Sequence, residues 1–234
     1  MTTLNIFCAG AAQAVVSQLA AKFQRESGNQ IHAEYGAVGA MKARVTGGAP
    51  VDIVVLTAAL VDELIAEGEV ARGSRVNLGR VGTGVAVRAG TPRPDVRNVE
   101  VLRANILAAT RIVCPDPAVA TAGKVVLHVL DQLGVAAEVT PRLQYFPNGY
   151  AAMANLAQSD GQLEMGITQV TEILANPGVT LVGPLPDAVQ NMAVYSAGLA
   201  VRAAHPERSR EFIRRLTGFN AQPVLSAAGF VVGG

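Results

Sequence analysis

Short apolar runs of strand length alternate with segments of helical periodicity along nearly the whole chain. Residues 4–8 form the first such run, and from Ala12 to Phe23 apolar residues recur at helical spacing until Ser27-Gly28 ends the helix. The same order continues, with strands predicted over 30–35, 52–56, 111–114, 143–146 and 164–168, and helices over 40–45, 58–67, 99–108, 121–133, 150–158, 206–216 and 221–227. This alternation is typical of an α/β fold in which helices cover both faces of a mostly parallel sheet.

Two long extended segments, Leu78–Arg88 and Asn191–Arg202, interrupt the alternation. They predict two lobes, the first formed by residues 1–80 and 196–234 and the second by residues 81–195. The segments themselves are expected to be adjacent hinge strands that permit the lobes to close. Ligands of open α/β sheets bind outside the carboxyl ends of the strands, so we expect the ligand site in a cleft between the lobes.

Composition excludes several classes of partner. Of 234 residues, 50% are hydrophobic, which is enough for a folded core, and 19 Lys and Arg nearly balance 18 Asp and Glu. Because nucleic-acid binders carry a basic face, no nucleic-acid partner is expected. Apolar runs are interrupted well before the roughly 20 residues that a membrane span needs, so no membrane insertion is expected either.

The first residues, Met1–Phe7, have no basic segment, apolar segment or cleavage site of a secretory signal. This pattern predicts a cytoplasmic protein. If a signal had been removed, the protein would be periplasmic, and only then would an ABC permease be an expected partner.

Common catalytic and cofactor motifs are absent from the sequence. Gly123-Lys124 is followed by Val125 instead of the Ser or Thr of a phosphate-binding loop, and no glycine-rich dinucleotide fingerprint follows the first strand. The three histidines are scattered and the two cysteines are far apart, without the spacing of metal ligands. We therefore expect neither a cofactor nor a metal.

Three loops of small residues lead into predicted helices, at 9–11, 38–40 and 120–123. Exposed backbone N–H groups at a helix N-terminus bind anions without a charged side chain, with help from the helix dipole. Small residues can also simply permit tight turns. Because all three loops are predicted at the same edges of the two sheets, they favour a site for a small-molecule anion.

At these loops the chain resembles the periplasmic molybdate-binding proteins, which are type II solute-binding proteins. The resemblance covers nearly the whole length, and its most specific motif is Gly-Ala-Pro-Val-Asp-Ile at 48–53. Its other landmarks are Ile6–Ala11, Tyr35–Ala40, Asp116-Pro117 with Ala122-Gly123, Leu163–Ile167 and Gly229-Phe230. The resemblance implies a two-lobed type II periplasmic-binding fold, with two mixed sheets, flanking helices and a two-strand hinge.

The departures from that family lie in the residues expected to touch the ligand. Ala11 and Val38 stand where the family has serines, and Gln169 replaces its tyrosine, whereas the backbone donors at Ala122 and Gly149 are retained. Each hydrogen bond that a buried oxyanion loses costs about 1–3 kcal/mol, so we expect a small organic di- or tricarboxylate as ligand in preference to molybdate. The expected ligand-binding residues are Ala9, Gly10, Ala11, Val38, Gly39, Thr121, Ala122, Asn148, Gly149, Tyr150, Thr168 and Gln169.

Some relatives of the molybdate-binding proteins are isomerases of unsaturated tricarboxylic acids such as aconitate, so the resemblance also implies a cofactor-independent isomerase. Cys8 and Cys114 end strands at matching places and are the candidate catalytic pair, with one thiol removing a proton and the other returning it. The alternative is that both are small buried hydrophobic residues. Lys42, Lys124, Glu34 and Tyr150 also lie near the loops, where surface positions are expected for Lys42 and Glu34.

Overall fold

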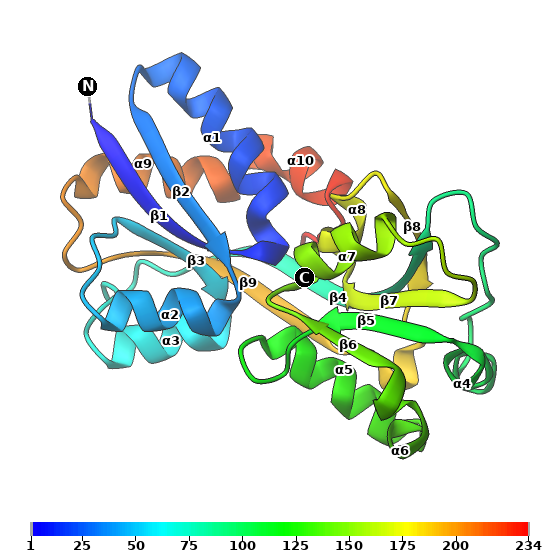
Figure 1. Ribbon diagram of the computed structural model, residues 1–234. Helices are drawn as coiled ribbons and strands as arrows, with labels where there is room; N and C mark the ends of the chain where they lie inside the picture. The colour runs from blue at the N-terminus through cyan, green and yellow to red at the C-terminus, as the bar shows by residue number, and fades with distance from the viewer. Residues whose placement is uncertain (1, 234) are drawn as a thin grey trace. The chain divides into compact units, whose positions relative to one another are not determined.

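The computed structural model describes residues 2–233 and shows an α/β fold (Figure 1). The strands in it are β1 (Thr3–Ala9), β2 (Gln30–Gly36), β3 (Ile53–Thr57), β4 (Val76–Arg88), β5 (Arg111–Pro115), β6 (Leu143–Phe146), β7 (Glu164–Gln169), β8 (Val179–Pro184) and β9 (Met192–Leu199). The α-helices in it are α1 (Gln13–Ser27), α2 (Val38–Thr46), α3 (Ala58–Ala66), α4 (Val99–Ala108), α5 (Thr121–Gln132), α6 (Ala136–Val139), α7 (Gly149–Ala157), α8 (Val170–Leu174), α9 (Pro206–Thr217) and α10 (Gln222–Ala227). Short 3₁₀ turns are η1 (Gly10–Ala12), η2 (Thr140–Arg142), η3 (Asp187–Val189) and η4 (Phe219–Ala221).

The chain divides into two compact units. Unit 1 comprises Met1–Val81 and Ala193–Gly234, and unit 2 comprises Gly82–Met192. The sequence prediction placed these boundaries at 80/81 and 195/196. The chain passes from unit 1 to unit 2 inside β4 and returns at the start of β9, so the two long extended segments are strands.

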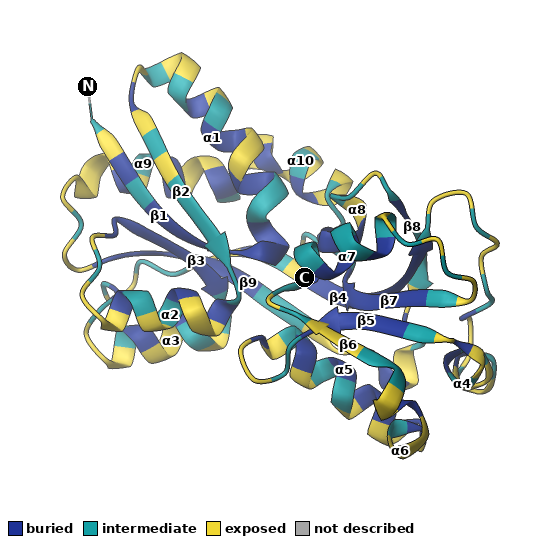
Figure 2. Ribbon diagram, in the orientation of Figure 1, coloured by how far each residue is buried: buried dark blue, intermediate teal, exposed yellow. Residues whose placement is uncertain are grey.

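Unit 1 is built on β1, which pairs in parallel with β2 on one side and β3 on the other. Strand β9 is antiparallel to β3. Ala9 and Gly36 are partners in register, so the loops that follow β1 and β2 begin side by side. All four residues from Ile53 to Leu56 are buried, as expected for a strand covered on both faces (Figure 2).

Helix α1 shows how the local sequence determines where a helix of unit 1 packs and where it ends. Its buried residues, Val15, Val16, Leu19, Ala20 and Phe23, follow the helical period and pack into the core. The helix ends at Gly28, whose φ of 69° lies in the left-handed region that glycine adopts without strain. The ring of Phe23 lies 5.2 Å from that of Phe212 on α9, which ties the returning C-terminal segment to this helix.

Unit 2 has a mixed sheet around β5, which is parallel to both β6 and β7. Strand β4 is antiparallel to β7 and to β8. Alternate residues of β5 belong to different cores: Ile112 and Cys114 pack in one cluster, whereas Val113 packs with residues of α7 in another. Helices therefore cover both faces of this sheet, which leaves the carboxyl ends of β5 and β7 free to carry loops.

The predicted α/β fold, with mixed parallel and antiparallel strands and flanking helices, is confirmed. The strand order is β2-β1-β3-β9-β4-β7-β5-β6, and β8 pairs with β4 beside this path. The helix α8 and the strand β8 were not predicted from the sequence.

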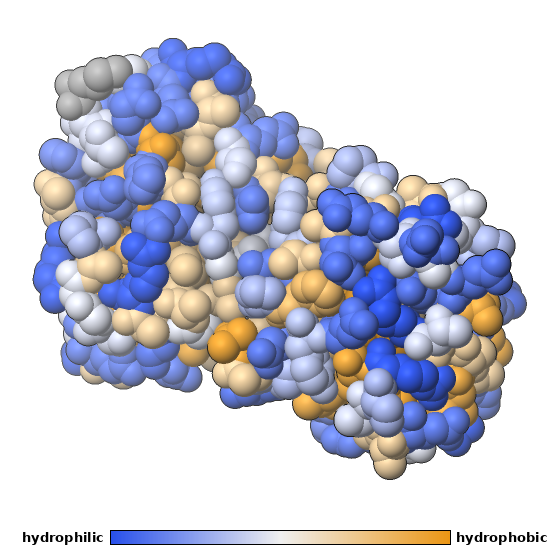
Figure 3. Space-filling model, in the orientation of Figure 1, coloured by the Kyte–Doolittle hydropathy of each residue, from blue (hydrophilic) through white to orange (hydrophobic). Residues whose placement is uncertain are grey.

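The surface seen in Figure 3 is mostly hydrophilic, with hydrophobic residues interspersed. Among the described residues, no helix has the length and apolar character needed to cross a bilayer. Phe219, at 83% exposure, and Leu163, at 69%, are the most exposed of the large hydrophobic residues.

Candidate functional site

In unit 2, three helices begin just after the ends of parallel strands. β5 leads through the segment 116–120 into α5, β6 through Pro147-Asn148 into α7, and β7 directly into α8. Parallel strands place their carboxyl ends at one edge of a sheet, so these three helix N-termini gather there. The predicted ligand residues of unit 2 lie on these loops and first turns, except for Thr168 and Gln169, which end β7.

The tightest contact at this edge joins the start of α7 to α8. Gly149 is buried, and a Cβ atom added to it would lie 2.0 Å from both Oε2 of Glu172 and Oγ1 of Thr168. The Thr168 hydroxyl donates a hydrogen bond to Glu172 Oε2 at 2.6 Å. Only glycine leaves room for this carboxyl group beneath the first turn of α7.

Glu172 is a functional candidate that sequence reasoning missed. It is 4% exposed, and burial raises the pKa of its carboxyl group to about 7. Hydrogen bonds from the Thr168 hydroxyl and from the backbone N–H groups of Gly149, Gln169 and Tyr150 oppose this shift but do not cancel it. The carboxyl group can therefore gain or lose a proton near neutral pH, as general acids and bases do.

At the end of β7, other buried polar groups lack partners. Gln169 is 3% exposed and its Oε1 has no hydrogen-bond partner, and the hydroxyls of Thr83 and Thr171 are likewise unpartnered. Thr83 is the register partner of Gln169 on the neighbouring strand β4, so the two side chains share one face of the sheet. Leaving such groups unpaired costs about 1–3 kcal/mol each, which a polar ligand could recover.

The other predicted residues of unit 2 have varied surroundings. Asn148 caps α7, because its Oδ1 accepts a hydrogen bond from the backbone N–H of Ala151 at 2.8 Å. Thr121 is exposed and Ala122 is partly buried, at the start of α5, which has no side-chain cap. Position 123 has no room for a side chain, because a Cβ there would lie 2.3 Å from the carbonyl oxygen of Pro115. Glycine leaves this space free.

In unit 1 the structure brings the two predicted loops together. Ala9, Gly10 and Ala11 are buried at the end of β1 and in η1, and Val38 is buried at the start of α2. Gly39 is exposed. Neither α1 nor α2 has a side-chain cap or an acidic residue in its first turn, so both keep uncompensated N-terminal dipoles.

The two thiols are fully buried. Burial raises the pKa of Cys8 well above its ordinary value, and its Sγ donates to the carbonyl oxygen of Ala9 at 3.3 Å. Burial and then the nearby Asp116 charge raise the pKa of Cys114 to about 12. These shifts oppose the thiolate that a thiol base requires, so a catalytic role for Cys8 and Cys114 stays a prediction without support from their surroundings.

The remaining proton-transfer candidates differ in whether their side chains already have hydrogen-bond or ion-pair partners. Lys42 donates to Glu63 and Glu67, at 2.6 and 2.8 Å, and Glu34 pairs with Arg44. The Tyr150 hydroxyl lies 3.4 Å from the carbonyl oxygen of Ala175. Lys124 is exposed in the first turn of α5. Within residues 2–233, no three His, Cys, Asp or Glu side chains gather as a metal site would require.

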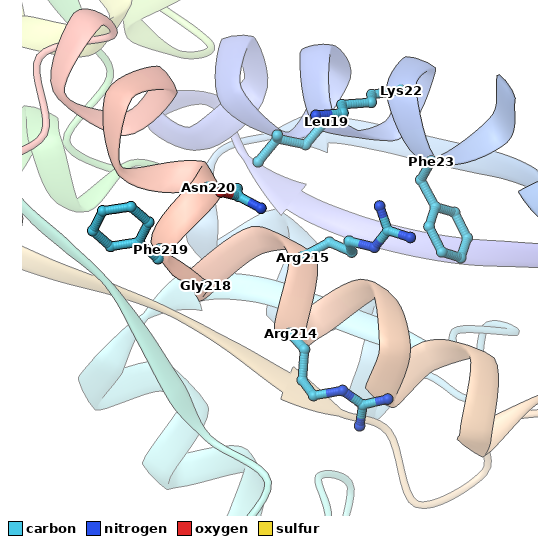
Figure 4. A pocket seen from close by; sticks show the side chains of 8 residues that line it. All are labelled: Leu19, Lys22, Phe23, Arg214, Arg215, Gly218, Phe219 and Asn220. Atoms are coloured by element: carbon cyan, nitrogen blue, oxygen red, sulfur yellow. The ribbon is translucent and has the colours of Figure 1, made fainter. Parts of the chain in front are cut away.

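A small pocket elsewhere in unit 1 lies between α1 and the segment from α9 to η4 (Figure 4). Its volume is about 150 Å³, below the 300–1,000 Å³ that is usual for ligand sites. Arg215, the cation that points toward Phe23 there, pairs with Glu26. This pocket therefore does not compete with the strand-end loops as the main site.

The chain is similar to known proteins over nearly its whole length. A family model described as bacterial extracellular solute-binding protein matches residues 4–231. An aconitate isomerase of Pseudomonas sp. is 26% identical over 242 residues, covering 98% of this chain and 87% of that protein.

Solved structures show the same fold. The periplasmic molybdate-binding protein of Azotobacter vinelandii matches with a TM-score of 0.83 at 21% identity, covering 99% of this chain and all of that one. The sulfate-binding protein SubI of Mycobacterium tuberculosis H37Rv matches with a TM-score of 0.74 at 19% identity, covering 98% and 86%. The resemblance to molybdate-binding proteins inferred from the loop motifs is thereby confirmed.

Proposed function

Because this chain belongs to the family of bacterial extracellular solute-binding proteins, we propose that it binds a small organic di- or tricarboxylate in preference to molybdate. The observation that carries the proposal is the unpartnered Oε1 of buried Gln169, beside the unpartnered hydroxyl of Thr83. Molybdate can only accept hydrogen bonds, so it would leave an acceptor without a partner. A hydroxy acid such as citrate offers a hydroxyl donor as well as carboxylate oxygens that accept.

The charge of Glu172 supports the same preference. Its carboxyl group already accepts hydrogen bonds from the backbone N–H groups of Gly149, one of the two donors expected to hold an oxyanion, and of Tyr150. A compact dianion at that place would meet a carboxylate, whereas a flexible polycarboxylate can place its charges elsewhere and approach Glu172 with an uncharged part. In unit 1, buried Ala11 and Val38 offer no hydroxyl to an oxyanion.

Restoring the two hydroxyls tests the proposal. The double variant Ala11→Ser with Val38→Ser should gain molybdate affinity by tenfold or more, since each new hydrogen bond is worth about 1 kcal/mol and 1.4 kcal/mol is a factor of ten. The wild-type protein should show a higher melting temperature with trans-aconitate or citrate and no change with molybdate, measured by thermal unfolding.

The control is Ala43→Ser, which adds a hydroxyl at an exposed position of α2. It should behave as the wild type does with every ligand. Wild-type protein that binds molybdate as tightly as the double variant would contradict the proposal.

A second candidate function is isomerisation of an unsaturated carboxylic acid. The aconitate isomerase relative and the pKa of about 7 at Glu172 favour it. In such a reaction a base removes a proton from a carbon next to the double bond, the double bond shifts, and a proton returns to the far carbon. Glu172 is a better base for this step than Cys8 or Cys114, whose thiols burial keeps protonated.

Deuterium exchange separates binding from catalysis. If the chain is an isomerase, wild-type protein in D₂O should incorporate deuterium at the carbon-bound positions of aconitate, and Glu172→Gln should slow this at least 100-fold. Cys8→Ser and Cys114→Ser should exchange at the wild-type rate. Loss of exchange in the cysteine variants alone would assign the proton transfer to the thiols, and no exchange in the wild type would leave binding as the function.

A further inference from the structure

Unit 2 contains a larger cavity away from the loops described above. Its volume is about 500 Å³, within the usual range for small-molecule sites. It lies where β4 ends and β7 begins, beside the end of α4 and the segment 91–94. In Figure 1 these elements meet at the edge of unit 2 near the label α4. Thr168 and Gln169 end β7, so the cavity and the anion-binding loops are at opposite ends of the same strand.

The cavity holds a cation that is incompletely paired. Arg88, the last residue of β4, lines it, and its buried Nε atom has no hydrogen-bond partner. The nearby carboxylate of Glu164 is bound to Arg111 at 2.7 Å and acts on Arg88 only through their charges. Arg93 adds a second positive charge from an exposed position on the cavity wall. A buried guanidinium N–H of this kind calls for an acceptor, and a carboxylate suits it best.

The remaining walls are largely apolar, formed by Pro92, Pro94, Ala108, Leu163 and Met165 among others. Leu163 has a φ of 55° and is the one non-glycine residue with positive φ among the described residues. It is also 69% exposed. Strained backbone of this kind concentrates at ligand sites, and an apolar ligand would cover the side chain that this conformation exposes.

We propose that this cavity is a second ligand site, which binds a small monocarboxylate with an apolar body, its carboxylate on Arg88. The proposed ligand carries a single negative charge, because Glu164 also lines the cavity and would repel a second negative group. The apolar walls require a hydrophobic body, such as a phenyl ring or a branched alkyl chain. The site therefore selects a different class of acid from the polycarboxylates proposed for the strand-end loops, and it does not depend on that proposal.

The test uses phenylacetate and 4-methylpentanoate as probes, with neutral phenylacetamide as the matched uncharged ligand. Isothermal titration should show saturable binding of at least one acid to the wild-type protein, with phenylacetamide at least tenfold weaker than phenylacetate. Arg88→Met should weaken binding of the acid at least tenfold. Ala108→Leu should do the same, because the added side chain fills the cavity and leaves Arg88 in place. Excess citrate should not displace the probe.

Arg97→Gln is the control, since Arg97 is exposed, pairs with Asp95 and does not line this cavity. It should bind the probe as the wild type does. If Arg88→Met does not fold, Ala108→Leu decides the outcome. The proposal is overturned if neither acid binds the wild type saturably, or if Ala108→Leu binds it with wild-type affinity.

Discussion

Replacing Gly149 with alanine is expected to lower the free energy of unfolding by about 3 kcal/mol and to abolish ligand binding. The added Cβ would lie 2.0 Å from Glu172 Oε2 and Thr168 Oγ1, so both of these buried side chains must move. Moving them breaks the hydrogen bond between Thr168 and Glu172 and takes the carboxyl group away from the backbone N–H groups of Gly149 and Tyr150. Urea unfolding gives the stability change, and titration with citrate gives the change in binding.

Gly183→Ala is the matched control, because a Cβ there would meet only a methyl group of Val96, at 3.2 Å. It should cost less than about 1 kcal/mol, because at 3.2 Å the Val96 methyl group needs to move by only a few tenths of an ångström. If the two variants lose equal free energy of unfolding, the close contact between Gly149 and Glu172 is not the cause of the loss in Gly149→Ala.

The second large effect is on pH dependence. The pKa of Glu172 is about 7 in the folded protein against an ordinary value of 4.5, so the folded state binds more protons between these values. The contribution of Glu172 to stability should therefore fall as the pH rises from about 4.5 to 7, by roughly 3 kcal/mol in total. Urea unfolding of the wild type and of Glu172→Gln at pH 5 and pH 8 measures it.

In Glu172→Gln this part of the pH dependence should disappear. Glu207→Gln removes an exposed carboxylate instead and should leave the dependence as in the wild type. A wild-type pH dependence that survives in Glu172→Gln would mean that the Glu172 carboxyl group titrates as an ordinary exposed one does.

Much of the fold followed from periodicity, because long amphipathic elements leave a clear signal. Helix α4 and strand β6 have the bounds that the sequence predicted, and α1 begins one residue after Ala12. Helix α8 was missed because its five residues are too short to show a helical period. Strand β8 was missed because its middle residues are half buried and show no alternation.

The candidate site was predicted less completely than the fold. Loop motifs and the family resemblance indicated Thr168 and Gln169, since these end a predicted strand. Glu172 was not identified from the sequence, because the contact that buries it comes from Gly149, which is 23 positions earlier in the chain. Thr83 could be identified only from the antiparallel register of β4 and β7, which no local pattern specifies.

The thiols show what a position in a strand leaves open. Cys8 and Cys114 each lie one residue before the end of their strands, close to the predicted strand ends. The sequence left the depth of burial open, and this burial raises both pKa values and opposes the thiolate form that a thiol base needs.

Isothermal titration of wild-type protein, cleared of ligand by unfolding and refolding, with citrate, trans-aconitate and sodium molybdate at neutral pH tests the proposed ligand class. We expect saturable binding of at least one tricarboxylate and no saturable heat from molybdate. If both tricarboxylates bind, they should compete with each other. Tight binding of molybdate, with no response to either organic acid, would contradict the proposed ligand class.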